Sequence, residues 1–194
     1  MAGFIGRLCG RGLPADNCDM LIARFVCYGV VTATVLGGCA PTLDWREVRL
    51  DGERLVMLFP CKPERHSRRV PMAGGEATVD VLGCSADGTT WGLTTADVGD
   101  LSRVALALEE LRTARSRNLD GRERQLRPVK LQGMKPAGIA LRFEVSGQRP
   151  DGKAVAEQSA VFSSATRVFH AAALGGTPSQ DALETFFGGL RLRP

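Results

Sequence analysis

The sequence predicts an α+β domain built on a single antiparallel β-sheet, a meander plus hairpins, with one long helix and one C-terminal helix packed on it. Three observations lead to this prediction. From Trp45 onward, short runs of alternating apolar and polar residues are separated by turn residues. Two other segments have apolar residues at helical spacing instead. The order is strands, a long helix, strands and a short helix, which favours helices covering an antiparallel sheet.

Five strands are expected in the first part of this region, at 45–50, 54–59, 67–72, 76–84 and 89–95. Asp51-Gly52 separates the first two strands and is a strong hairpin signal. Pro71 indicates that the third strand lies at a sheet edge, because proline cannot donate to a ladder. Trp91 and Leu93 are two positions apart, so they should share one face of the fifth strand.

The clearest helix is expected from Asp100 to Asn118, where Asp100 can cap the free amide groups. Its apolar stripe consists of Leu101, Val104, Leu108 and Leu111. Further strands are expected at 122–131, 139–147, 154–162 and 167–174.

A second helix is expected near the end of the chain. Thr177 and Gln180 form a capping-box pair, with Pro178 in the first helical position. The helix then carries an apolar stripe that must pack on something, made of Leu183, Phe186, Phe187 and Leu190.

Composition excludes several classes of protein. The chain has 194 residues, of which 44% are hydrophobic and 24% charged. These fractions are those of a globular protein, not of a disordered chain or a multi-span membrane protein. The net charge of +4 is too small for a dedicated nucleic-acid binder, so no nucleic-acid partner is expected.

The first 38 residues predict an export signal. Phe25 to Leu36 is an apolar stretch of about a dozen residues behind Arg24, as in the apolar region of a signal peptide. The charge-free run continues to Leu43, but its glycines and proline fit a transmembrane helix badly. Met20 opens a short positive segment of its own. We therefore expect translation to begin at Met20, although a long natural leader is the alternative.

The segment Leu36-Gly37-Gly38-Cys39 resembles the lipobox of bacterial lipoproteins. This resemblance implies that Cys39 becomes the first mature residue, with diacylglycerol on its thiol and a fatty acyl group such as palmitate on its amine. Residues 39–44 would be a lipidated tether and 45–194 the single domain. Ala40, in place of aspartate, implies the outer membrane facing the periplasm. An ordinary cleaved signal, or a buried apolar segment with an incidental cysteine, is the alternative.

Cys61 and Cys84 would be the two cysteines left after lipidation of Cys39. An even pair in an export compartment predicts a disulfide, with two free buried thiols as the alternative. The cysteines lack zinc-ligand spacing, and we expect neither a metal nor a cofactor.

No catalytic constellation is visible in the sequence, and no catalytic residue is predicted. His66 lies among basic residues in a solvated segment, whereas His170 alternates with apolar residues and should be half-buried and hydrogen-bonded. The protein is therefore expected not to be an enzyme. The alternative is a periplasmic enzyme, either a hydrolase or a thiol-dependent redox factor using Cys61 and Cys84.

One basic stretch could contact anionic headgroups or an acidic envelope partner. It consists of Arg112, Arg115, Arg117, Arg122, Arg124, Arg127 and Lys130. The alternative is that these residues form an ordinary solvated surface.

Three short elements resemble small bacterial proteins with the PsbP/Mog-type fold, among them uncharacterised proteobacterial envelope proteins. They are Phe59-Pro60-Cys61-Lys62-Pro63, Pro150-Asp151-Gly152 and the closing segment 184–192. The resemblance implies an α-β-α sandwich around an antiparallel sheet. Known members are adaptors or assembly factors and share no catalytic motif. The expected function is thus a lipid-anchored envelope protein with a non-enzymatic binding, adaptor or assembly domain.

Overall fold

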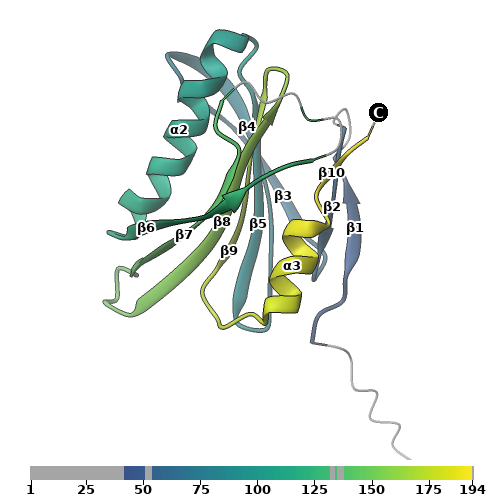
Figure 1. Cartoon of the computed structure of the whole chain (residues 1–194), viewed down its shortest axis with the longest axis vertical. Coiled ribbons are helices and arrows are strands. Elements are labelled where there is room, and N and C mark those ends of the chain that lie inside the picture. The colour runs from purple at the N-terminus through teal and green to yellow at the C-terminus, as the bar shows by residue number, and fades with distance from the viewer. Residues whose placement is uncertain (1–41, 51–53, 132–133, 135–137, 194) are drawn as a thin grey trace, which may run out of the picture. The chain divides into compact units, whose positions relative to one another are not determined.

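The computed structural model describes residues 42–50, 54–131, 134 and 138–193 (Figure 1). Residues from Pro41 onward form a compact unit of their own. Cys39 and the predicted signal region 1–38 lie outside the described residues, as does the Asp51-Gly52 turn.

The larger of two sheets contains seven strands, each antiparallel to its neighbours. In spatial order they are β3 (Glu64–Met72), β4 (Gly75–Ala86), β5 (Thr89–Asp97), β9 (Arg167–Leu174), β8 (Ala154–Ser164), β7 (Leu141–Gln148) and β6 (Arg122–Pro128) (Figure 1). The edge position expected from Pro71 is confirmed, because β3 is the first strand of this order.

A second sheet corrects the prediction of a single one. It contains β1 (Arg46–Arg49), β2 (Leu55–Phe59) and β10 (Arg191–Leu192), in the order β1-β2-β10. The prolines at 60 and 63 interrupt the ladder after β2, so β3 does not continue the meander. The position beside β2 is taken by β10, the last strand of the chain. Its two residues are too few to produce a periodic signal in the sequence.

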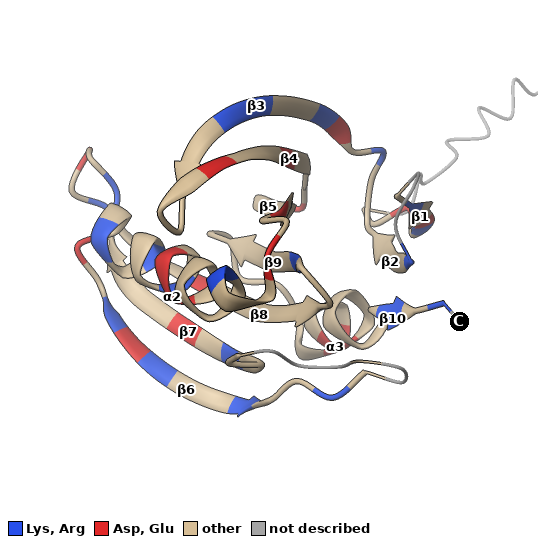
Figure 2. Cartoon of the chain, turned by 90° about the horizontal axis from the view of Figure 1, so that it is seen from above, with Lys and Arg blue, Asp and Glu red and all other residues tan. Residues whose placement is uncertain are grey.

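The two helices cover opposite faces of the larger sheet. The helix α2 (Leu101–Asn118) packs on β7, β8 and β9, and the Asp100 carboxylate accepts from the amide of Ser102 at 2.8 Å as its N-cap. The helix α3 (Gln180–Gly188) lies beside β2 and β10 (Figure 2). The expected capping box is wrong, because the hydroxyl of Ser179, not Thr177, accepts from the amide of Ala182.

Each face of the larger sheet has its own hydrophobic core. On the α3 side, Phe186 contacts Trp91 and Phe59 edge to face, with ring centroids 5.0 and 5.7 Å apart. On the α2 side, Val104 and Leu108 are fully buried. The inclusion of Leu101 in the apolar stripe was wrong, because this residue is 59% exposed and does not belong to the core. Residues of the compact unit build both cores, so we expect this unit to fold without residues 1–40.

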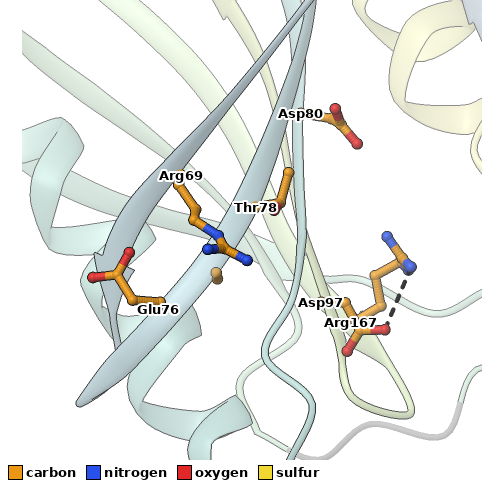
Figure 3. A pocket seen from close by; sticks show the side chains of 7 residues that line it. Arg69, Glu76, Thr78, Asp80, Asp97 and Arg167 are labelled. Atoms are coloured by element: carbon orange, nitrogen blue, oxygen red, sulfur yellow. Dashed lines mark hydrogen bonds and ion pairs between the residues drawn. The ribbon is translucent and has the colours of Figure 1, made fainter.

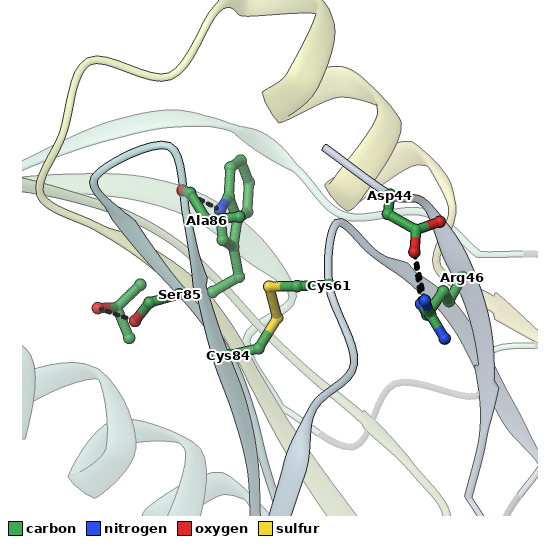
Figure 4. The surroundings of a disulfide bond; sticks show 8 residues. Asp44, Arg46, Cys61, Cys84, Ser85 and Ala86 are labelled. Carbon is green, nitrogen blue, oxygen red and sulfur yellow. Dashed lines mark hydrogen bonds and ion pairs between the residues drawn. A yellow bond between two sulfur atoms is a disulfide. The ribbon is translucent and has the colours of Figure 1, made fainter. Parts of the chain in front are cut away.

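The predicted disulfide between Cys61 and Cys84 is present. Cys61 follows β2 of the small sheet and Cys84 lies in β4 of the large one (Figure 4). The Cα atoms are 6.0 Å apart, within the usual range for such bonds. The bond therefore fastens the small sheet to the large sheet.

Candidate functional site

The predicted basic stretch is distributed over two layers of the fold. Arg112, Arg115 and Arg117 lie on α2, and Arg122, Arg124 and Arg127 lie on β6 (Figure 2). The α2 residues cover one face of the large sheet. The cross-strand partners of Arg124 and Arg127 are Glu144 and Arg142, which face the α3 side.

Several of these cations already have carboxylate partners. Arg112 donates from Nε to both oxygens of Glu123, at 2.9 and 3.0 Å. Arg124 pairs with Glu144 at 3.2 Å, and Arg127 pairs with Glu184 on α3. Their charge is thus largely balanced within the domain, while Arg117, Arg122 and Lys130 are exposed.

A polar network lies under α2 where the sequence predicted only a hydrogen-bonded histidine. Ser159 Oγ lies 2.9 Å from His170 Nε2 and donates to Glu157 Oε1 at 2.6 Å. Arg115 Nε donates to the same carboxylate oxygen at 2.7 Å. Glu157 and Ser159 are completely buried, and His170 is 4% exposed rather than half-buried. Burial lowers the pKa of His170 to about 4, so the ring is neutral near pH 7.

This network has the residue types of a hydrolase triad but not its geometry. In a triad, serine and carboxylate bind opposite nitrogens of the imidazole ring. Here both lie near the same nitrogen, with Glu157 Oε1 3.8 Å from His170 Nε2. The hydroxyl donates to the carboxylate, and α2 covers it from solvent. The arrangement satisfies buried polar groups and offers a substrate no access to Ser159.

A groove on the opposite face is the stronger candidate for binding. We call it the Arg142 groove; it has a volume of about 410 Å³ and lies between the end of β6 and α3. Its apolar lining includes Pro128, Val129, Leu131, Ala160, Phe187 and Leu190. Its cationic lining is Arg127, Lys130, Arg142 and Arg191.

Arg142 is the unusual residue of this groove, because it is an arginine only 5% exposed. Its guanidinium carbon lies 4.2 Å from the centroid of the Phe187 ring, a cation–π contact. The terminal nitrogens donate to Glu184 at 2.9 Å and to Gln158 at 3.0 Å. Burial lowers the pKa of Arg142, and the hydrogen bond to Glu184 acts in the opposite direction.

The Nε–H of Arg142 has no hydrogen-bond partner among the described residues. An unpaired donor buried in a protein costs free energy, and such groups are few in native structures. The site therefore holds a cation whose hydrogen-bonding capacity the domain does not fully use.

Sequence reasoning identified two residues of this groove, Arg127 and Lys130, as members of the basic stretch, but it did not identify Arg142 or the apolar lining. Arg142 belongs to the polar half of an alternating strand, which ordinarily faces water. In the structure α3 covers the face of β7 that carries Arg142, and α2 covers the other face. The strand is therefore buried on both faces at this position. One signal was available: Glu184 stands on the second predicted helix, next to the apolar stripe that had to pack on the sheet.

A second hollow is polar; it is lined by residues of β3 and β4 together with Asp97 at the end of β5 and Arg167 at the start of β9 (Figure 3). Two of its three carboxylates already have donors: Asp80 accepts from Arg65 and Ser67, and Asp97 from the amide of Gly99 and from Arg167. These hydrogen bonds lower the pKa of Asp80, with the Arg65 contribution the largest. Because Asp80 and Asp97 are already held by donors of the domain, this hollow is less suited to an ionic ligand.

Comparisons with known proteins do not identify the chain: it matches no family model and no curated protein. Across the described ranges, no helix is both long and apolar enough to cross a bilayer. The same residues contain no cluster of His, Cys, Asp and Glu suited to a metal ion.

Proposed function

We propose that this is a lipid-anchored protein of the bacterial cell envelope whose domain is a non-enzymatic binding or adaptor module. The anchor would be the lipid on Cys39, and the location the periplasmic face of the outer membrane. The observation that carries the binding role is Arg142, a buried arginine with an unused donor in a groove that is otherwise mainly apolar.

Two features support the proposed compartment. The first is the lipobox-like segment ending at Cys39. The second is the disulfide between Cys61 and Cys84, since such bonds persist in oxidising compartments and are rare in the cytosol.

The PsbP/Mog-type fold is part of the same proposal. The layers are helix, seven-stranded sheet, and helix with a small sheet, which suits an α-β-α sandwich. Two of the three resembling elements meet in the small sheet: Phe59 ends β2, and Leu192 of the closing segment pairs with Leu55 of the same strand. Adaptors and assembly factors of that fold act by binding, which agrees with a groove as the functional site.

Photo-crosslinking in the native cell tests the binding role. A photoreactive residue at Lys130, on the groove, should capture one defined envelope component. The matched control is the same residue at Arg117, which is also exposed but lies on α2. The adduct at 130 should disappear when Arg127→Gln removes a groove cation. Capture at neither position, or equal capture at both, would contradict the proposal.

The intact mass of the protein from native membranes tests the anchor separately. We expect residues 39–194 plus a diacylglycerol and an amide-linked acyl chain, with a small mass gain on reduction as the disulfide opens. An unprocessed mass would remove the proposed location.

A further inference from the structure

We propose that the Arg142 groove binds an acyl-chain carboxylate, with the chain on the apolar lining and the carboxylate beside Arg127 and Lys130. This inference names the ligand class of the site and rests on the binding role proposed above. It follows from the apolar lining of the groove, from its excess of positive charge and from the hydrogen-bonding state of Arg142.

The apolar lining is preformed. Val129, Phe187 and Leu190 belong to the core on the α3 side and are at least 92% buried, so the sheet and α3 hold them in place. Leu131 packs against the same core from the segment that follows β6. A volume of about 410 Å³ falls in the range of small-molecule sites, which are mostly apolar with a few polar groups.

The charges around the groove fit one additional anion. Glu184 already accepts from Arg127 and Arg142, so the site holds one carboxylate between two arginines. Lys130 makes no ion pair with a described residue, and its ammonium adds a positive charge at the same place. A ligand carboxylate between Lys130 and Arg127 would make charge-assisted hydrogen bonds, which are stronger than neutral ones.

The hydrogen bonds of Arg142 also favour an added acceptor. Its two terminal nitrogens have partners, but its Nε–H has none within the described part of the chain. A third hollow, next to the groove and also polar, has a volume of about 300 Å³ and shares Arg127 and Arg142 with the groove. The arginine pair thus separates an apolar space from a polar one, the division that an amphiphile requires.

An acyl chain suits this lining better than a peptide does. A peptide would bring amide and carbonyl groups into contact with Pro128, Leu131 and Phe187, whose side chains cannot bond to them. Backbone polar groups without partners are costly to bury. An acyl chain has no such groups, and its single charged end matches the cationic part of the groove.

Calorimetric titration of residues 41–194, the compact unit with its disulfide intact, tests the inference. The probes are decanoate below its micelle concentration, 1-decanol as the uncharged analogue, and acetate as the anion without a chain. Decanoate should bind about tenfold or more tightly than decanol, as expected for one charge-assisted contact, and acetate should give no measurable binding.

Variants locate the binding within the groove. The double variant Arg127→Gln/Lys130→Gln should weaken decanoate binding about tenfold or more and bring it close to that of decanol. Leu131→Ser should weaken the binding of decanoate and of decanol equally, because it removes only an apolar contact. The matched control is Arg68→Gln/Arg69→Gln, which removes two exposed cations from β3 at the far edge of the sheet and should change nothing.

The results separate this inference from the proposed function. Three results would overturn the ligand class. They are equal binding of decanoate and decanol, no binding of either, and equal effects of the groove double variant and the β3 double variant on decanoate binding. Specific crosslinking at residue 130 together with any of those results would leave the binding role intact. Selective decanoate binding that the groove variants abolish would support the ligand class whatever the crosslinking shows.

Discussion

Lowering the pH from about 7 to about 5 is expected to weaken the fold through one buried side chain, His170. Burial under α2 lowers its pKa in the folded protein from the ordinary 6.5 to about 4, although the nearby Glu157 acts in the opposite direction. As the pH falls below 6.5, the unfolded chain takes up a proton at this residue and the folded protein does not. The unfolded state then binds more protons, so the free energy of unfolding decreases.

The size of the effect follows from the two pKa values. A difference of one pKa unit corresponds to about 1.4 kcal/mol, so the loss reaches about 2 kcal/mol at pH 5 and about 3 kcal/mol near pH 4. The stability is recovered above 6.5. Carboxylates with lowered pKa values, such as Asp80 and Glu184, lose their contribution only below their ordinary values of 3.8 and 4.5. The interval from about pH 6.5 to 5 therefore reports mainly on histidine.

Urea denaturation followed by tryptophan fluorescence measures this loss, since Trp91 is fully buried. His170→Gln keeps a donor near Ser159 but does not titrate, so its stability should change about 2 kcal/mol less over the interval. The control is His66→Gln, whose side chain is 78% exposed in the native protein, and which should behave like the native chain. An identical pH dependence in the native protein and in His170→Gln would refute the reasoning.

Two further predictions concern stability. Replacing both bonded cysteines, Cys61→Ser/Cys84→Ser, should lower the free energy of unfolding by about 3 kcal/mol, because the unfolded chain regains the freedom of a closed loop; an unchanged urea midpoint would speak against this. Arg115→Met should cost about 3–5 kcal/mol, because it leaves the fully buried Glu157 without its cation. Arg124→Met removes an exposed pair and should cost at most about 1 kcal/mol, so similar losses in the two variants would contradict the assigned burial.

Local elements were predictable where a segment carries its own signal. The helix from Asp100 has a capping side chain and apolar residues at helical spacing, and it ends at Asn118 as expected. The strand at Arg167–Leu174 has the expected bounds. The cysteine pair was predictable because the other cysteines were assigned to the predicted signal region and to lipidation. This assignment left an even number, Cys61 and Cys84, in the domain.

The candidate site was not predictable in this way. Arg142 looks like a solvent-facing residue of an alternating strand, and only the position of α3 turns it into a buried cation. His170 and Ser159 lie on adjacent strands of a predicted hairpin, so their proximity could have been read from the register. Their complete burial depends on the packing of α2, and this could not be read from the register.

The sequence by itself determined the strands other than β10, the helices and the disulfide, because hydrophobic period, capping and cysteine count are local properties or simple counts. Tertiary structure alone decided that β2 pairs with β10, since that contact joins residues far apart in the chain and one strand is only two residues long. It also decided which charges are buried. The same basic stretch contains Arg115, which pairs with the buried Glu157, and Lys130, which is exposed in the groove. Only the tertiary packing around each residue distinguishes the two.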